Sequence, residues 1–479
     1  MNFSHVPKNV FLVIAVVLLS CPAVSLAEDW PTYQHDNRRS GATDEKLKFP
    51  LVEKWTFKSA RPPQNAWEGP AKWDAYSKQS DLKSMRNFDP AFYVTVVDDK
   101  VYFGSSADDA AHCLDAATGD NAWSFYTNGP VRLPPTIFDG KAYFGSDDGN
   151  AYCVDARSGE LVWQNKPSTD DKIIPSNGKL ISTYPVRTGV LVRDGIAYFG
   201  ASLLPWRDSH LVAVDAQTGH RDGPGLFKTT HQGMAMQGAL LASDEYVYVL
   251  QGRSAPIVFN RDQGKKRGTI SGEGGVYALI TEDDHFIAGA PSQKVDRFKE
   301  TDERGRDQMA SYEGANRIVV DGGIAYLHSK RELSAFNREE YIGIQGEIFA
   351  REPELKRLDK ELKELRKRSK ADKDDEVVKK AMRDVAKSKK TVQEEVDGFI
   401  AKLPDCFLWR IACEYPQSLI KAGNTVIAGG TNAIAAYNAK TGDEIWSRPV
   451  EGIAHGLTVA NKQLYVSTDK GYIHCFAKG

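Results

Sequence analysis

One short pattern recurs along this chain and constrains its fold more than any other feature. The segments DAATGDNAW from Asp115 and DARSGELVW from Asp155 place an acid, a Thr/Ser-Gly pair and a Trp at the same spacing. Related segments follow at AVDAQTG from Ala213 and AAYNAKTGDEIW from Ala435. A chain that repeats one supersecondary unit folds as an array of that unit, so the repeat decides the fold class.

Short apolar strands accompany the repeat. Eight are recognisable: KVYFGSS from Lys100, KAYFGSD from Lys141, IAYFGAS from Ile196, YVYVLQG from Tyr246, HFIAGAP from His285, IAYLHSK from Ile324, TVIAGGT from Thr425 and QLYVSTD from Gln463. A strand and a polar hairpin turn such as TIFDG precede them, and a third strand, the Asp-x-x-Thr-Gly turn and a fourth strand follow. Four antiparallel strands at a period of about 40 residues describe a propeller blade. We predict an all-β, eight-bladed β-propeller.

The fourth strands carry the tryptophans of the repeat, which are Trp123, Trp163, Trp409 and Trp446. Each buries roughly 200 Å² when it fills the wedge between neighbouring blades, so we interpret them as inter-blade packing. The last blade lacks a fourth strand because the chain ends at YIHCFAKG. The orphan segment VEKWTF, from Val52 to Phe57, has Trp55 in the repeat position. We expect this N-terminal strand to close the ring and remove its exposed edges.

The N-terminus predicts export. Residues 1–27 have a basic start and an apolar core from Val10 to Leu19 that is too short to span a bilayer, which is typical of a secretory signal peptide cleaved before Glu28. Lipid attachment at Cys21 is the alternative. We therefore expect a periplasmic or secreted propeller over residues 28–479, with no transmembrane segment. Five cysteines remain, an odd number at positions typical of a buried core, so we expect free thiols.

The A-x-D-x-x-T-G-x-x-x-W pattern resembles the repeat of pyrroloquinoline-quinone-type (PQQ-like) propellers. The segments AAYNAKTGDEIW, HCLDAATGDNAW and YCVDARSGELVW carry this resemblance, and the start DWPTYQHDNRRSG is similar to the leader of secreted members. The family includes quinone-dependent dehydrogenases and non-catalytic members such as the propeller lipoprotein of the outer-membrane β-barrel assembly machinery. Alcohol dehydrogenases of this type carry adjacent cysteines beside the quinone and Glu, Asn and Asp around Ca²⁺. This chain has neither a Cys-Cys pair nor Cys-x-x-Cys-His.

These observations favour a non-catalytic binding or scaffold protein of the cell envelope, with no cofactor and no metal. Its partner would be an envelope protein or an extracytoplasmic ligand. A net charge of −2 with balanced signs argues against nucleic acid. A PQQ- and Ca²⁺-dependent oxidoreductase acting on alcohols or sugars is the alternative. A lyase or hydrolase whose site lies in the same central funnel of the propeller also stays open.

Strand order places the long loops, Lys58 to Pro90, Gln164 to Thr183 and Leu203 to Ser209, on one face, where every first strand begins. The residues before those strands are unusually polar or aromatic. We therefore name as ligand candidates at the central mouth Arg132, Tyr184, Arg187, Gln237, Asn316, Arg317, Tyr415, Gln417 and His455. The three arginines come from three blades and are expected to converge on a carboxylate or other anion.

An insertion between Asn337 and the Trp409 strand is expected to be a coiled-coil-like helical hairpin over residues 350–402. Its apolar residues recur three and four apart with one gap: Leu355, Leu358, Leu362 and Leu365, then Val378, Met382, Val385, Val392, Val396 and Phe399. Interleaved Lys and Glu indicate a solvated surface. A hairpin with a single seam is also a candidate docking element for a partner helix.

Overall fold

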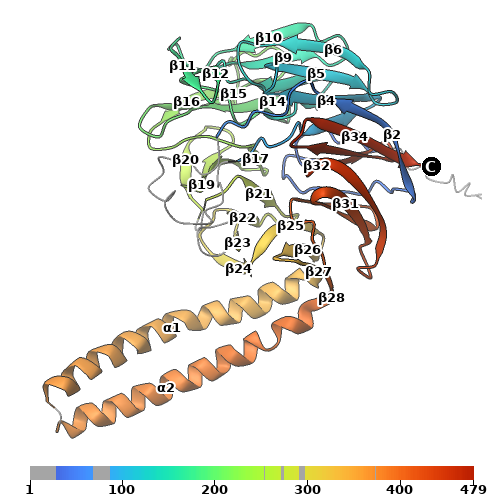
Figure 1. Cartoon of the computed structure of the whole chain (residues 1–479). Coiled ribbons are helices and arrows are strands. Elements are labelled where there is room, and N and C mark those ends of the chain that lie inside the picture. The colour runs from blue at the N-terminus through green and yellow to red at the C-terminus, as the bar shows by residue number, and fades with distance from the viewer. Residues whose placement is uncertain (1–27, 68–86, 253, 271–273, 291–296, 373) are drawn as a thin grey trace, which may run out of the picture.

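The computed structural model describes residues 28–67, 87–252, 254–270, 274–290, 297–372 and 374–479. The predicted signal peptide, residues 1–27, and Cys21 lie outside them. The described chain is mostly β, with four-stranded antiparallel sheets and one helical hairpin that projects from the body (Figure 1). This is the architecture of a β-propeller, as the repeat predicts.

Six sheets contain four strands in sequential order. They are β3 (Val94–Val97), β4 (Lys100–Ser105), β5 (Ala110–Asp115) and β6 (Asn121–Tyr126); β7 (Thr136–Phe138), β8 (Lys141–Gly145), β9 (Ala151–Asp155) and β10 (Leu161–Asn165); β13 (Leu191–Arg193), β14 (Ile196–Ala201), β15 (Ser209–Asp215) and β16 (Phe227–His231); β17 (Leu241–Ala242), β18 (Tyr246–Gln251), β19 (Ser254–Asn260) and β20 (Lys266–Thr269); β21 (Tyr277–Ile280), β22 (Phe286–Ala290), β23 (Arg297–Thr301) and β24 (Gln308–Glu313); and β25 (Ala315–Asp321), β26 (Ile324–Ser329), β27 (Glu332–Asn337) and β28 (Phe407–Ala412). A separate hairpin, β11 (Ile173–Ser176) and β12 (Lys179–Ser182), precedes β13.

The remaining strands form one eight-stranded sheet. In spatial order they are β1 (Ala42–Thr43), β29 (Ser418–Ala422), β30 (Thr425–Gly429), β31 (Thr431–Asn438), β32 (Glu444–Ala460), β33 (Gln463–Thr468), β34 (Tyr472–Lys478) and β2 (Leu51–Lys58). The 17-residue strand β32 pairs with β31 through its first half and with β33 through its second. The N-terminal strand β2 pairs antiparallel with the C-terminal strand β34, with Trp55 opposite Cys475.

Tryptophan clamps join neighbouring sheets. The indole Nε1–H of Trp123 donates to the carbonyl of Ala156 in the next sheet at 2.9 Å. The same bond runs from Trp163 to Ala216, from Trp409 to Ala439, from Trp446 to Leu51 and from Trp55 to Ala116, at 2.8–3.0 Å. The inter-blade role predicted for these residues is confirmed.

The Asp-x-x-Thr/Ser-Gly turn serves the same clamp. Asp155 accepts hydrogen bonds from the amides of Arg157 and Ser158, which fixes the turn. Gly159 then adopts a φ of +75°, and a Cβ there would lie 2.8 Å from the ring of Trp123. Glycine is therefore required both for the backbone and for the close approach of the indole.

Three junctions of the described sheets use something other than Trp. Phe227 packs under Gly264, and Ile270 packs under Gly305. At the third junction, the buried side chain of Arg338 reaches back to the preceding sheet and donates to Glu300 at 3.1 Å and to Asp283 at 3.0 Å. A buried ion pair replaces an aromatic wedge at that position.

The inserted arm consists of α1 (Arg338–Ala371), α2 (Glu376–Ile400) and the short 3₁₀ turn η1 (Leu403–Cys406), between β27 and β28. The expected hairpin over 350–402 therefore starts too late, because α1 begins at Arg338. The twelve residues before Ala350 continue the helix down to the sheet, where Tyr341 stacks on Tyr312 with 5.5 Å between ring centroids. The predicted seam is present, since its most buried members are Leu358, Leu362, Leu365, Val378 and Val396.

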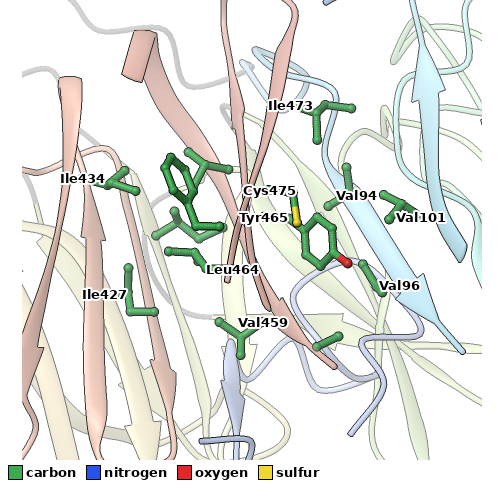
Figure 2. Packing of buried hydrophobic residues seen from close by; sticks show 14 of the residues in the cluster. Val94, Val96, Val101, Ile427, Ile434, Val459, Leu464, Tyr465, Ile473 and Cys475 are labelled. Atoms are coloured by element: carbon green, nitrogen blue, oxygen red, sulfur yellow. The ribbon is translucent and has the colours of Figure 1, made fainter. Parts of the chain in front are cut away.

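Apolar side chains fill the spaces between sheets. Figure 2 shows Val94, Val96 and Val101 of β3 and β4 packed near Tyr465 and Cys475 of β33 and β34. The described cysteines are all buried and free, as the sequence predicts: Cys113, Cys153, Cys406, Cys413 and Cys475. Burial raises the pKa of the Cys113 thiol to about 12, so it stays protonated inside the core.

The clamp predicts unequal costs for two similar glycines. Gly159→Ala should lower the free energy of unfolding by about 2–4 kcal/mol, because the methyl group meets both the left-handed backbone and the Trp123 ring. Gly195 has nearly the same φ, +73°, but nothing lies within 4 Å of the point that a Cβ would occupy there, so Gly195→Ala should cost only about 1–2 kcal/mol. Chemical denaturation of both variants measures the difference, and equal losses would contradict the clamp.

The arm beyond its base should be dispensable for folding. Replacing residues 351–402 by a short Gly-Ser linker should leave the melting temperature nearly unchanged, because the distal helices pack mainly on each other. Arg338→Met should instead destabilise the protein by about 3 kcal/mol, since it leaves the fully buried Glu300 carboxylate without its guanidinium. A linker variant that fails to fold would show that the arm belongs to the core.

Candidate functional site

The leader, defined here as residues 30–41, closes the central axis at one end. It forms backbone hydrogen bonds with the first strands of several sheets, through Val96 of β3, Ile137 of β7, Ala242 of β17, Ile280 of β21 and Lys421 of β29, at 2.7–2.9 Å. The Asn37 amide also donates to the Val192 carbonyl of β13 at 2.8 Å. These partners lie mostly toward the ends of their strands, so the leader fills the axis on the side opposite the long loops.

Arg39 occupies the middle of this leader. It is 4% exposed and donates to the carbonyls of Leu240 and Tyr33 at 2.9 and 2.7 Å. Burial lowers the pKa of its guanidinium to about 10. The charge is held by backbone carbonyls, which makes Arg39 a structural pin of the axis.

Two of the three candidate arginines meet at the other end of the axis. Arg132 donates through Nε to Asp147 at 2.8 Å and through Nη1 to Asp89 at 2.6 Å. Arg187 binds Asp147 through two nitrogens, at 2.9 and 2.8 Å. The side chains of all four residues are at most 3% exposed. Two of the three arginines expected to converge on an anion thus meet on carboxylates of the chain itself, and Arg317 does not join them.

Burial and the neighbouring arginines shift the pKa values of the two carboxyl groups of this cluster in opposite directions. Burial by itself would raise the pKa of Asp147, but Arg132 and Arg187 outweigh it and hold that pKa below its ordinary value. For Asp89 burial is the larger effect, and the pKa of that carboxyl is raised despite Arg132. Asp147 is therefore the carboxylate that neutralises the two guanidinium groups most firmly.

The long-loop segments next to this cluster cover the mouth. The Trp67 indole donates to Gln237, and the Arg187 guanidinium lies 5.5 Å from the centroid of the Trp67 ring. A small apolar cluster lies beside them, made of Ala66, Phe88, Leu133 and Ala239. Gln237 and Arg187 thus bind neighbouring protein groups from the loop that begins at Lys58.

Arg317 has different surroundings. It is partly exposed, donates to the carbonyl of Asn316 at 2.6 Å and lies 5.4 Å from the centroid of the Tyr277 ring. Within the described chain it forms no ion pair. Burial, followed by the charge of Arg317, lowers the pKa of His455 to about 4, so the imidazole beside it is neutral at neutral pH. Arg317 therefore keeps an uncompensated positive charge near the axis.

Two tyrosines complete the surroundings of Arg317. Tyr33 of the leader and Tyr93 pack edge to face with centroids 5.0 Å apart. Burial raises the pKa of both hydroxyls, and Arg317 opposes that rise in each. Neutral phenols and one arginine can together bind an anionic group by charge-assisted hydrogen bonds.

The other candidates hold loops in place. Tyr184 stacks on His210, at 5.4 Å between centroids, and carries Arg207 on its ring at 5.1 Å. The Asn316 amide lies 3.0 Å from His328 Nδ1 and also donates to the Lys330 carbonyl. The backbone N–H of Gln417 donates to the Gly429 carbonyl, and Tyr415 packs on a hydrophobic cluster. The structure does not bring these four residues into one group.

Sequence reasoning missed Asp89, Asp147 and Trp67, the partners of the candidate arginines. Asp147 follows the KAYFG strand in a turn whose acids look like turn chemistry, and the other two lie in a long loop without a motif. The available signal was the arginines themselves, because buried guanidinium groups need carboxylates.

Comparison with known proteins places the chain in a family. It matches the family described as outer membrane protein assembly factor BamB over residues 55–340 and 413–479. The chain belongs to this BamB family. The match skips residues 341–412, which hold almost the whole arm and β28. No curated protein sequence matches the chain.

Solved structures resemble the chain in fold. Quinohemoprotein alcohol dehydrogenase from Comamonas testosteroni superposes with a TM-score of 0.56 at 12% identity, covering 94% of this chain and 81% of that one. The computationally designed Ika8 protein gives 0.52 at 11%, covering 82% and 98%. BamB from Moraxella catarrhalis gives 0.49 at 12%, covering 83% and 98%. At these identities the likeness concerns the fold alone.

The residues present fit a PQQ and Ca²⁺ site poorly. PQQ is a tricarboxylate, yet two of the three candidate arginines already bind Asp147 and Asp89. Among the described residues, no three His, Cys, Asp or Glu side chains are grouped so as to hold a metal ion, and the cysteines there are unpaired. None of the described helices is long and apolar enough to cross a membrane.

Two clefts open at junctions that lack the Trp clamp. One, of about 380 Å³, adjoins the Phe227 junction and is lined by Tyr198, Asn260 and Arg261 among others. The other, of about 500 Å³, lies at the base of the arm between Tyr341, Phe407 and the neighbouring sheets. Both follow from replacing an indole wedge by smaller or charged groups.

The neutral state of His455 predicts a pH dependence. Its folded pKa of about 4 lies below the ordinary value of 6.5, so its contribution to stability is complete above pH 6.5 and is lost as the pH falls toward 4. We expect the melting temperature of the wild type to fall more steeply between pH 6.5 and pH 4 than that of His455→Gln. Parallel pH profiles for the two proteins would show that the imidazole is not desolvated.

Proposed function

We propose that this protein is a non-catalytic β-propeller of the cell envelope that binds an anionic group of a partner protein or extracytoplasmic ligand at Arg317. The observation that carries the proposal is the contrast among the candidate arginines. Arg132 and Arg187 are neutralised by Asp147 and Asp89, whereas Arg317 is partly exposed and has no carboxylate partner in the described chain.

We propose that the ring has eight blades and is closed by β2. Support comes from the six four-stranded sheets and from the long strand β32, which divides the eight-stranded sheet. Its first half forms a set of four with β29, β30 and β31, and its second half forms another with β33, β34 and β2. The pairing of β2 with β34 and the Trp55 bond to Ala116 support closure, because they join the last set to the first sheet. An eighth blade completed this way leaves no gap between the last set of strands and the first sheet.

The envelope location rests on two observations. The sequence of residues 1–27 is typical of a secretory signal, and the family that the chain belongs to is described as an outer membrane protein assembly factor. We propose a periplasmic or secreted protein, with lipid attachment at Cys21 as the alternative form.

The long-loop face offers a second contact region at the β11–β12 hairpin. Ile173 and Leu180 of the β11–β12 hairpin are 63% and 64% exposed, and Trp206 of a neighbouring long loop is 77% exposed. Arg207 links that loop to Asp170, just before the hairpin, at 2.8 Å. Exposed large apolar side chains gathered near one face support a protein partner.

A binding experiment tests the Arg317 site. We expect partner capture from an envelope extract, measured by cross-linking and co-purification, to fall at least about tenfold in Arg317→Met, the loss of one charge-assisted contact. The control, Arg331→Met, removes an arginine that is 86% exposed and should leave capture unchanged. Both variants should keep the wild-type melting temperature. Undiminished capture by Arg317→Met would show that Arg317 is not the binding site. If capture is lost only when residues 351–402 are deleted, the arm is the binding surface, in its role of docking a partner helix.

Reconstitution tests the alternative function. The protein is incubated with PQQ and Ca²⁺ and assayed for quinone absorbance and for dye-linked oxidation of alcohols and sugars. We expect neither a bound quinone spectrum nor turnover, because two axial arginines are already neutralised. Stoichiometric quinone binding with turnover would establish the oxidoreductase instead.

A further inference from the structure

The distal half of the arm, residues 363–390, is strongly basic. It contains twelve Lys or Arg against six Asp or Glu, a net charge of +6 in a chain whose total is −2. The arm carries these charges far from the propeller, because α1 has 34 residues and is therefore about 50 Å long (Figure 1). The charge is a property of the projecting end, separate from the propeller.

Several of these cations share one side of the hairpin. On α1, Lys363 and Arg366 directly follow the seam residues Leu362 and Leu365. On α2, Lys379 and Arg383 directly follow Val378 and Met382. The two helices run in opposite directions and turn their seams toward each other. These two reversals cancel, so the residue that follows a seam residue lies on the same side of the hairpin in both helices. Both helices therefore contribute to one basic face.

The opposite side has the opposite sign. Glu361 and Glu364 directly precede Leu362 and Leu365 of α1, and Asp384 directly precedes Val385 of α2. By the same geometry these acids share the other side of the hairpin. The two sides of the distal hairpin therefore differ in charge, although Arg368 lies on the side of the acids.

Four cations of the basic face are free to bind a partner, whereas Lys379 pairs with Glu376 at 2.7 Å. In the proximal half, Arg351, Lys356 and Arg357 are held by glutamates at 2.7 Å. In the distal half, Lys363, Arg366, Lys370 and Arg383 are exposed, and within the described chain they form no ion pair. Repulsion among unpaired like charges costs stability, so the arrangement makes sense when an anionic surface supplies the counter-charge.

We propose that this basic face binds an anionic lipid surface. A face two helices wide matches a flat layer of phosphate headgroups, and each Lys or Arg near such a surface contributes about 1 kcal/mol. Nucleic acid is disfavoured by the expected envelope location, so this choice of surface rests on that part of the proposed function. A second copy of this chain would have to present its acidic side to the basic face. This is disfavoured because Arg368, which directly precedes Ser369, lies on the same side as the three acids and weakens the charge match.

Vesicle co-sedimentation of the full chain tests the inference. We expect binding to vesicles of phosphatidylcholine mixed with phosphatidylglycerol, none to phosphatidylcholine alone, and a loss of binding as salt is raised. The combined variant Lys363→Gln, Arg366→Gln, Lys370→Gln and Arg383→Gln should weaken binding at least about tenfold. Equal binding to both vesicle types would overturn the proposal.

A matched variant separates the face from the bulk charge. Lys367→Gln, Arg368→Gln, Lys380→Gln and Lys387→Gln remove the same charge from the same helices away from the basic face and should keep most of the binding. Far-ultraviolet circular dichroism checks that both arms stay helical. Equal loss in the two variants would overturn the face, and oligonucleotide binding or salt-dependent dimerisation without vesicle binding would replace the lipid by another partner. Capture through Arg317 is measured separately and is unaffected by either result.

Discussion

The hydrogen bond from a tryptophan indole to a backbone carbonyl of the next sheet is the contact on which the ring depends. It combines direction, through the Nε1–H bond, with a large apolar wedge against a glycine that has no side chain to obstruct it. The Asp-x-x-Thr-Gly turn presents both the carbonyl and the glycine. One repeated turn recurs at these contacts, and two of the three junctions without Trp, those at Phe227 and Arg338, adjoin clefts.

The leader imposes the second constraint. Its hydrogen bonds to the first strands of several sheets replace a solvent-filled axis by an ordered backbone. The opposite end is closed by the Arg132, Asp147 and Arg187 cluster beneath the loop that carries Trp67. Buried charges are tolerated only when they are paired, so the main role of the carboxylates in this cluster is to neutralise the two buried arginines. Arg317 stands apart because its neighbours are phenols and a neutral imidazole, which leaves its charge available.

The arm divides into parts with different physical roles. Its base belongs to the propeller, because Arg338 and Tyr341 contact the neighbouring sheet directly. Its middle is a self-contained seam with ion pairs on the surface. Its distal half is basic and carries the exposed, unpaired cations Lys363, Arg366, Lys370 and Arg383. The propeller and the arm end are thus two separate positively charged regions, which we propose as binding surfaces.

The sequence alone determined the repeat, the strands, the role of the tryptophans and the helical arm, because these depend on local periodicity and on the turn chemistry of glycine and aspartate. It also located the arginines before the first strands. Only the tertiary structure decided which of those arginines are neutralised, because Asp89 and Asp147 are 43 and 15 residues away from Arg132 in the chain and reach it only through folding. The start of α1 at Arg338 has a local signal, because Asn337 caps the helix by accepting a hydrogen bond from the Glu340 amide. Only the tertiary structure shows that Arg338 then pairs with Glu300 of the preceding sheet.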